Sequence, residues 1–219
     1  MLGLNQPVET FESKYTDHGQ IRRLLAHSAG LRVPQTASPF EALSWAIIGQ
    51  QVSVSAAVSI RRKFITAANI RHSSGLLCFP DAHAVLDMGE DVLRNSGFSR
   101  TKATALRNLS EAVVSGDVPL NKWLGLLRKG KMDIEHIRSR LTAIRGIGPW
   151  TVSYALLRGF GWLDGSLHGD VAVRRNLTRL LHMQEPVTEK ETEAWLAEFA
   201  PWRALVAAHL WAMQTSAGF

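Results

Sequence analysis

Apolar residues recur along most of this chain at the spacing of an amphipathic helix, and the strict alternation typical of a half-buried strand is scarce. Over residues 17–27, for example, Ile21, Leu24 and Leu25 fall on one helical face, and Gly30 follows the end of the pattern. A chain of 219 residues is long enough to bury the core of one large domain or of two small ones. The pattern therefore predicts an all-α protein.

Signals for helix N-termini mark two consecutive helices. Ser38 can cap the first helix, Pro39 suits its first position, and Glu41 can complete a capping box. The sequence GQQVS interrupts this helix, and Ser53 can cap a second helix that runs to about Ala68, so the connection between them is very tight. Further helices are predicted at 81–88, 90–97, 101–115, 120–128 and 133–145.

The sequence AIRGIGPWT, residues 143–151, joins two predicted helices through a four-residue turn. Pro149 suits the first position of the second helix, while Gly146 and Gly148 permit positive φ and a close approach of another backbone or a ligand. Free N–H groups in the first turn of a helix favour an anion. The segment is either a phosphate-binding hairpin or an ordinary helix–turn–helix corner with a glycine cap.

Two aromatic residues and one aspartate follow this turn. Trp150 and Tyr154 are four residues apart and share a helix face, as core residues or as the stacking wall of a base pocket. Asp170, in HGDVAVRR, precedes another helical run, where an aspartate commonly serves as an N-cap.

Composition narrows the classes of function. With 25 Lys and Arg against 19 Asp and Glu, the net charge of +6 favours a polyanionic partner. Cys78 is the only cysteine, which excludes an intramolecular disulfide and a cysteine-ligated cluster, and without an HExxH pair we expect no dedicated transition-metal site. The sequence shows neither a secretory signal nor a run of 18 apolar residues, so we expect a cytoplasmic protein.

The segment LTAIRGIGPWTVSYALLRGFGWLDGSLHGDVAVRR resembles the helix–hairpin–helix, Gly/Pro…Asp superfamily of DNA glycosylases, and within it the 3-methyladenine DNA glycosylase II (AlkA) group. The resemblance covers residues 38–215 and includes FEALSWAIIGQQVSVSAA and PWRALVAAHLW. It implies two helical subdomains with a DNA-binding cleft between them. We expect residues 39–165 to form the one that ends in the helix–hairpin–helix motif, and residues 1–38 with 166–219 to form the other.

The resemblance also implies roles in catalysis and base recognition. Asp170 matches the catalytic aspartate of the family. Trp150, Tyr154 and Trp211 match the aromatic residues that line the pocket for the extruded base.

The same resemblance implies the contacts with the DNA backbone and the base stack. Gly146, Ile147 and Gly148 match the hairpin whose backbone amides hold a phosphate, where the family also allows a bound monovalent cation; no metal is required. Gln51 lies where the family places the side chain that fills the duplex after base flipping, and neighbouring Gln50 is expected to assist it.

Two features depart from the best-known AlkA pattern, and a third separates this chain from bifunctional relatives. Those members begin with an additional mixed α/β domain, for which this chain is too short, and their wedge is leucine where this chain has Gln51. Bifunctional relatives carry a lysine in the hairpin helix at the position of Trp150. The absence of that lysine predicts base excision without strand cleavage.

The sequence therefore predicts a monofunctional glycosylase that excises 3-methyladenine- and 7-methylguanine-type bases by flipping them and hydrolysing the N-glycosidic bond. The expected partner is double-stranded DNA with damaged bases. We expect a monomer that needs no cofactor and associates with the nucleoid through DNA. Two alternatives are a non-catalytic helix–hairpin–helix DNA-binding protein and a glycosylase for deaminated or oxidised bases.

Other charged residues near these motifs have simpler explanations. Asp164 is either a turn residue or a support for Asp170, and His168 either borders the pocket or shapes its loop. The basic run Arg61, Arg62 and Lys63 is expected on a solvated helix face that can touch phosphates.

Overall fold

The computed structural model describes residues 6–131 and 133–213, which form helices and no strand; one isolated antiparallel bridge pairs Arg71 with Leu77. The all-α prediction is confirmed. The chain divides into two compact units, Thr36–Ala155 and Met1–Gln35 with Leu156–Phe219.

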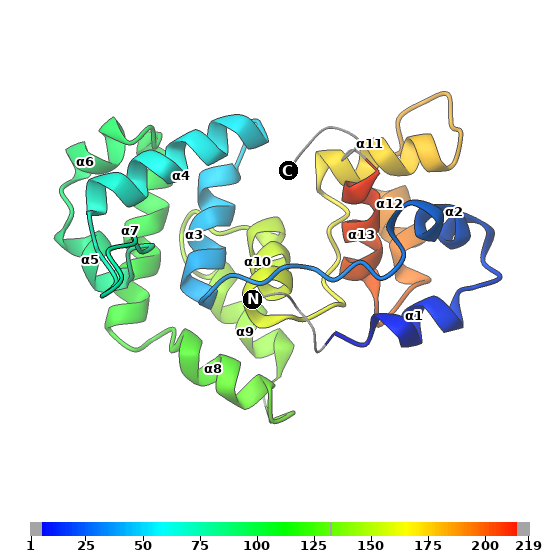
Figure 1. Ribbon diagram of the computed structural model, residues 1–219, viewed down its shortest axis with the longest axis horizontal. Coiled ribbons are helices and arrows are strands. Elements are labelled where there is room, and N and C mark those ends of the chain that lie inside the picture. Colours follow the sequence, from blue (N-terminus) through cyan, green and yellow to red (C-terminus); the bar gives the residue numbers. More distant parts are fainter. Residues whose placement is uncertain (1–5, 132, 214–219) are drawn as a thin grey trace. The chain divides into compact units, whose positions relative to one another are not determined.

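The unit Thr36–Ala155 contains eight helices in its described part (Figure 1): α3 Pro39–Gly49, α4 Val54–Ala68, α5 Ala82–Asp87, α6 Glu90–Asn95, α7 Arg100–Val114, α8 Leu120–Leu127, α9 Ile134–Thr142 and α10 Pro149–Ala155. Helix α3 is the central helix and packs on α4, α7 and α10. Its apolar side chains are buried around most of its circumference, among them Leu43, Ile47 and Ile48.

Local sequence signals set the ends of α3 and α4. Ser38 Oγ accepts a hydrogen bond from Glu41 N at 3.1 Å, and Ser53 Oγ accepts one from Ala56 N at 3.2 Å. The Glu41 carboxylate reaches back to Ala37 N, one residue beyond the position that a standard capping box uses. The predicted starts of both helices are confirmed.

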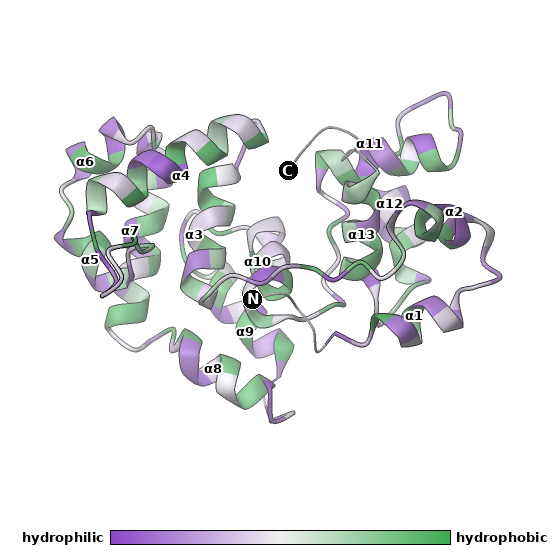
Figure 2. Cartoon of the chain, viewed as in Figure 1, coloured by the Kyte–Doolittle hydropathy of each residue, from purple (hydrophilic) through white to green (hydrophobic). Residues whose placement is uncertain are grey.

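The second unit is built from both ends of the chain. Its described helices are α1 Val8–Lys14, α2 Gly19–Ser28, the π-helix Leu156–Phe160, α11 Val171–Leu180, α12 Glu189–Ala197 and α13 Arg203–Ala212. Hydrophobic residues dominate α13 (Figure 2), which packs against α2, α11 and α12. None of the helices in the described part of the chain is both long and apolar enough to cross a membrane.

Several element boundaries differ from the sequence prediction. Helix α2 begins at Gly19 rather than Asp17, because His18 Nδ1 accepts from Ile21 N and caps it. Helix α9 ends at Thr142, three residues before the predicted end near Arg145. Neither α1 nor the π-helix was predicted from the sequence.

One histidine is buried in the core of the second unit. His209, on α13, is 1% exposed, stacks on Phe11 with ring centroids 5.6 Å apart, and lies 2.6 Å from Ser28 Oγ through Nδ1. Burial lowers the pKa of His209 from 6.5 to about 4. Folding therefore keeps this imidazole neutral at a pH where the unfolded chain would protonate it.

We expect the free energy of unfolding to fall as the pH is lowered from 6.5 to 4, because only the unfolded chain takes up a proton at position 209 in this range. The His209 contribution to this loss is about 3 kcal/mol. Urea unfolding of the parent, His209→Gln and the exposed-histidine control His72→Gln at several pH values tests it. His209→Gln should flatten the pH dependence and His72→Gln should not; equal slopes in all three proteins would contradict the assignment.

Candidate active site

The turn between α9 and α10 is closed by hydrogen bonds within it. Ile147 N donates to Ile144 O at 3.0 Å, and the Ile147 side chain is only 4% exposed. Gly146 has φ of +97°, and a Cβ at this residue would lie 2.4 Å from Ala105 Cβ on α7. Only glycine combines this backbone conformation with so close a contact.

The two glycines leave polar backbone groups available on the outside of this turn. The amides of Gly146 and Gly148 have no acceptor among the described residues, and a Cβ at Gly148 would meet nothing within 4 Å. The Ile147 amide, in contrast, is used inside the turn. A phosphate bound here would therefore be held by the glycine amides and by the first turn of α10, while Ile147 anchors the turn through its side chain. The role of the hairpin in phosphate and monovalent-cation binding stays a prediction.

Trp150 and Tyr154 lie on one face of α10, as their spacing indicated. Their ring centroids are 5.5 Å apart and their planes are inclined by 31°. Both side chains are half-buried, so part of each ring surface is accessible. An aromatic pair of this kind is suited to stacking a flat ligand.

Asp170 lies in the second unit at the start of α11. Its Oδ1 accepts hydrogen bonds from Ala172 N and Val173 N, both at 2.9 Å, and from Trp211 Nε1 on α13 at 3.1 Å. The two amides make Asp170 the N-cap of α11, and Trp211 adds a contact that capping does not require. The structure thus brings together Asp170 and Trp211, two residues that the resemblance had assigned separately to catalysis and to the base pocket.

The two glutamines of the α3–α4 connection have different environments. Gln51 is exposed and has φ of +54°, a left-handed conformation that is unfavourable for a residue with a side chain. Gln50 is half-buried, and its Nε2 donates to Gly146 O at 3.2 Å and to Thr151 Oγ1 at 3.0 Å. Gln51 is thus placed as a protruding side chain, whereas the predicted insertion of Gln50 into a duplex would require both of its hydrogen bonds to break.

Asp164 and His168 shape the loop that precedes Asp170. The Asp164 carboxylate binds the Arg203 guanidinium through two hydrogen bonds, at 2.7 and 2.9 Å, and thereby ties the loop to the start of α13. His168 Nδ1 lies 2.8 Å from Ser166 Oγ within the same loop. Both interactions stabilise the segment that carries Asp170.

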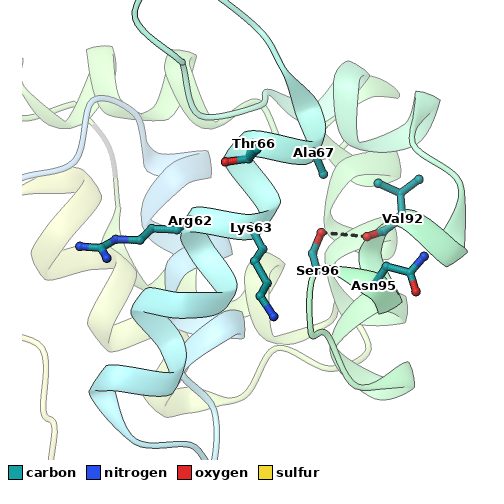
Figure 3. A pocket seen from close by; sticks show the side chains of 7 residues that line it. All are labelled: Arg62, Lys63, Thr66, Ala67, Val92, Asn95 and Ser96. Atoms are coloured by element: carbon teal, nitrogen blue, oxygen red, sulfur yellow. Dashed lines mark hydrogen bonds between the residues drawn. The ribbon is translucent and has the colours of Figure 1, made fainter.

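The basic run on α4 is only partly the solvated face that its sequence suggested. Arg61 pairs with Glu41 and packs over the rings of Trp45 and Phe79, with its guanidinium carbon 5.5 and 5.4 Å from their centroids. Arg62 and Lys63 instead line an open hollow of about 450 Å³ between α4 and α6 (Figure 3). None of the predicted site residues lines this hollow.

Sequence reasoning missed the residues that support the hairpin from within its own unit. Asn108 hydrogen-bonds to the hairpin, Thr151 to Gln50 in the α3–α4 connection, and Lys102 to the last turn of α3, which leads into that connection. The sequence carries no local signal for these three contacts, because their partners lie 37, 101 and 54 residues apart. In the part of the chain that the structure describes, no group of three or more His, Cys, Asp or Glu residues is arranged to hold a metal ion.

Residues 44–201 match the family of HhH-GPD superfamily base excision DNA repair proteins. This chain belongs to that superfamily. Among its relatives, DNA-3-methyladenine glycosylase 1 of Schizosaccharomyces pombe is 30% identical, with 79% of this chain and 71% of the relative aligned. DNA-3-methyladenine glycosylase 2 of Escherichia coli is 27% identical, with 89% of this chain and 64% of the relative aligned. The predicted HhH-GPD membership and the placement in the 3-methyladenine glycosylase group are confirmed.

Solved structures of the superfamily share this fold. The 3-methyladenine DNA glycosylase of S. pombe in complex with abasic DNA superposes with a TM-score of 0.80 at 25% identity, over 98% of this chain and 99% of that chain. A 3-methyladenine DNA glycosylase from Archaeoglobus fulgidus gives a TM-score of 0.81 at 24% identity, over 99% of this chain and 72% of that one. The HhH-GPD fold therefore extends over nearly the whole of this chain.

Proposed function

We propose that this protein is a monofunctional DNA glycosylase that removes alkylated purines from double-stranded DNA in base excision repair. The observation that carries the proposal is the position of the Asp170 carboxylate. One of its oxygens accepts three hydrogen bonds, two from backbone amides and one from the Trp211 indole N–H. An ordinary N-cap needs only the amides. The names of its HhH-GPD relatives support 3-methyladenine and related bases as substrates.

In this proposal the damaged nucleotide first rotates out of the duplex, since its glycosidic bond is inaccessible in the stack. The amides of Gly146 and Gly148 hold a backbone phosphate, and Gln51 fills the vacancy that the nucleotide leaves. Trp150, Tyr154 and Trp211 stack on the extruded base. A base that alkylation has made cationic interacts more favourably with these electron-rich rings, by about 0.5–2 kcal/mol for each good contact.

Alkylation at N3 or N7 places a positive charge on the purine, so the base leaves as a neutral molecule and needs no general acid. As the C1′–N bond breaks, positive charge develops on the sugar, where an ionised Asp170 stabilises it. Water then adds to C1′ and loses one proton, so the products are the free base and an abasic site. One carboxylate is enough for this reaction, in contrast to glycosidases that must also protonate their leaving group.

Trp150 supports the monofunctional assignment. A lyase requires an amine that attacks C1′ and forms a covalent intermediate with the sugar. The resemblance places that amine at the position that Trp150 occupies, and an indole cannot perform this attack. We also infer that the protein acts as a monomer in the cytoplasm, where its net positive charge favours association with DNA.

The test of this function is the release of free bases from duplex DNA treated with dimethyl sulfate, resolved by chromatography, with untreated DNA as control. We expect 3-methyladenine and 7-methylguanine from the treated DNA only, and strands that remain uncut until alkali is added. Cut strands before alkali would contradict the monofunctional assignment. DNA binding without release of any base would favour a non-catalytic DNA-binding protein.

A further inference from the structure

The side chain of Gln50 bridges two segments that are far apart in sequence. Gln50 follows the last residue of α3, and its Nε2 is shared between Gly146 O, on the hairpin, and Thr151 Oγ1, in the first turn of α10. The side-chain amide of Gln50 therefore links the segment between α3 and α4 to both sides of the hairpin. The Thr151 side chain is buried, so this acceptor is held in a fixed position.

Helix α7 contacts both the last turn of α3 and the hairpin. Lys102, Ala105 and Asn108 recur every three residues and so lie along one side of this helix. Lys102 Nζ donates to Ile48 O at 2.8 Å, Ala105 contacts Gly146, and Asn108 Nδ2 donates to Arg145 O at 3.1 Å. A single helix thus contacts the end of α3 and the hairpin at once.

Lys102 is an unusual residue for a purely structural contact. Lys102 is only 8% exposed, and desolvation by burial lowers the pKa of its amine below the ordinary value. Burying an ammonium group costs free energy. The hydrogen bond from Lys102 to Ile48 O therefore indicates that the last turn of α3 has to be held in a fixed position. That turn leads directly into Gln50 and Gln51.

Gln51 needs such support for the role given to it under the proposed function, on which this inference rests. The residue is exposed and has a left-handed backbone that is unfavourable for a side chain, so its conformation depends on how the connection around it is held. A side chain that enters the base stack must keep a set distance from the group that grips the phosphate.

We propose that Gln50 is a positioning residue: it joins the α3–α4 connection to the hairpin, so that gripping a backbone phosphate and inserting Gln51 into the duplex occur together. Lys102 braces the last turn of α3, which leads into this connection, through its hydrogen bond to Ile48 O. Gln50 itself stays out of the duplex and keeps its hydrogen bonds to Gly146 and Thr151.

The variant Gln50→Met tests this role, because methionine has a similar length and helix propensity but cannot donate a hydrogen bond. Single-turnover excision is measured on one methylated purine in a fully paired duplex and on the same purine in a one-nucleotide bulge, where it is already unstacked. We expect a loss of about 100-fold on the paired duplex, the scale of a small misplacement in an active site, and little loss on the bulge. The control Gln20→Met, on α2, should behave as the parent on both.

Fluorescence of 2-aminopurine next to the lesion reports opening of the duplex without any chemistry. Parent protein should raise this fluorescence on binding, and Gln50→Met should not, while both bind duplex DNA with similar affinity. Thr151→Val, which removes one of the two acceptors of Gln50, should give a smaller loss in the same direction. It provides a second variant if Gln50→Met folds poorly.

Equal losses on the paired and bulged substrates, or no loss on either, would overturn the positioning role. If the parent opens the duplex but releases no base, the proposed function fails, and the fluorescence comparison still decides the role of Gln50. If Gln50→Met opens the duplex as the parent does, the inference is wrong even though base release by the parent supports the glycosylase function.

Discussion

Replacing Asp170 with asparagine should lower the rate of base release by about 1,000-fold while leaving the fold intact. The catalytic effect follows from charge, because a neutral amide cannot stabilise the positive sugar that forms as the base leaves. The fold should be retained because asparagine caps helices about as well as aspartate. Its Oδ1 can still accept from Ala172 N, Val173 N and the Trp211 indole, as the Asp170 Oδ1 does.

Asp81 offers a matched control for this experiment. It caps α5 through a hydrogen bond from Ala84 N to its Oδ1 at 2.9 Å, and among the described residues no indole N–H donates to it. Asp81→Asn should therefore excise bases at the parental rate, and both variants should unfold within about 0.5 kcal/mol of the parent. Single-turnover base release, urea unfolding and DNA affinity are measured for all three proteins. Parental activity in Asp170→Asn would return this residue to a purely structural capping role.

The contrast between Asp81 and Asp170 also shows what the sequence could predict. Each aspartate precedes a helical pattern, and the cap at each helix start is recognisable from a few neighbouring residues. The same is true of Ser38 and Ser53, whose caps form as expected. The indole of Trp211 lies 41 residues from Asp170 in the sequence, and no local pattern indicates that its N–H reaches the carboxylate.

Gln50 illustrates the same limit. Its partners Gly146 and Thr151 are 96 and 101 residues away, and their contact depends on the packing of α3 against α10. From the sequence alone, Gln50 is indistinguishable from a second exposed turn residue next to Gln51. In the structure the two differ: Gln50 is half-buried and makes both hydrogen bonds, whereas Gln51 is exposed and has a left-handed backbone.

Two helices were not predicted from the sequence, each for a physical reason of its own. Helix α1 has seven residues, too few for a clear periodic pattern, and is held by the burial of Val8 and Phe11. The five-residue π-helix Leu156–Phe160 continues directly from α10, and the apolar pattern of LLRGF does not distinguish it from an α-helix. Tertiary packing decides these elements, whereas capping residues decide the starts of α3 and α4.

The second large effect is expected on stability, at the first glycine of the hairpin. Gly146→Ala should lower the free energy of unfolding by about 3 kcal/mol, because alanine is strained at positive φ and its Cβ would meet the Ala105 side chain. The distances are decisive: the added carbon would lie 2.4 Å from Ala105 Cβ and 3.2 Å from Ala105 Cα, so the backbone of α7 or of the hairpin must move. For a chain of this size, the melting temperature should fall by roughly 6–12 °C.

Gly116 and Gly148 separate the causes of this effect. Gly116 also has positive φ, +86°, but a Cβ there meets nothing within 4 Å, so Gly116→Ala should show the backbone strain alone, about 1 kcal/mol. Gly148 has neither positive φ nor a close neighbour, so Gly148→Ala should fold normally. It should instead weaken DNA binding about tenfold, because the added methyl group occupies the space where a phosphate would approach the amides. Urea unfolding and fluorescence anisotropy with an undamaged duplex measure the two effects. Equal destabilisation by Gly146→Ala and Gly116→Ala would show that α7 yields to the added carbon, and parental DNA affinity in Gly148→Ala would place the phosphate elsewhere.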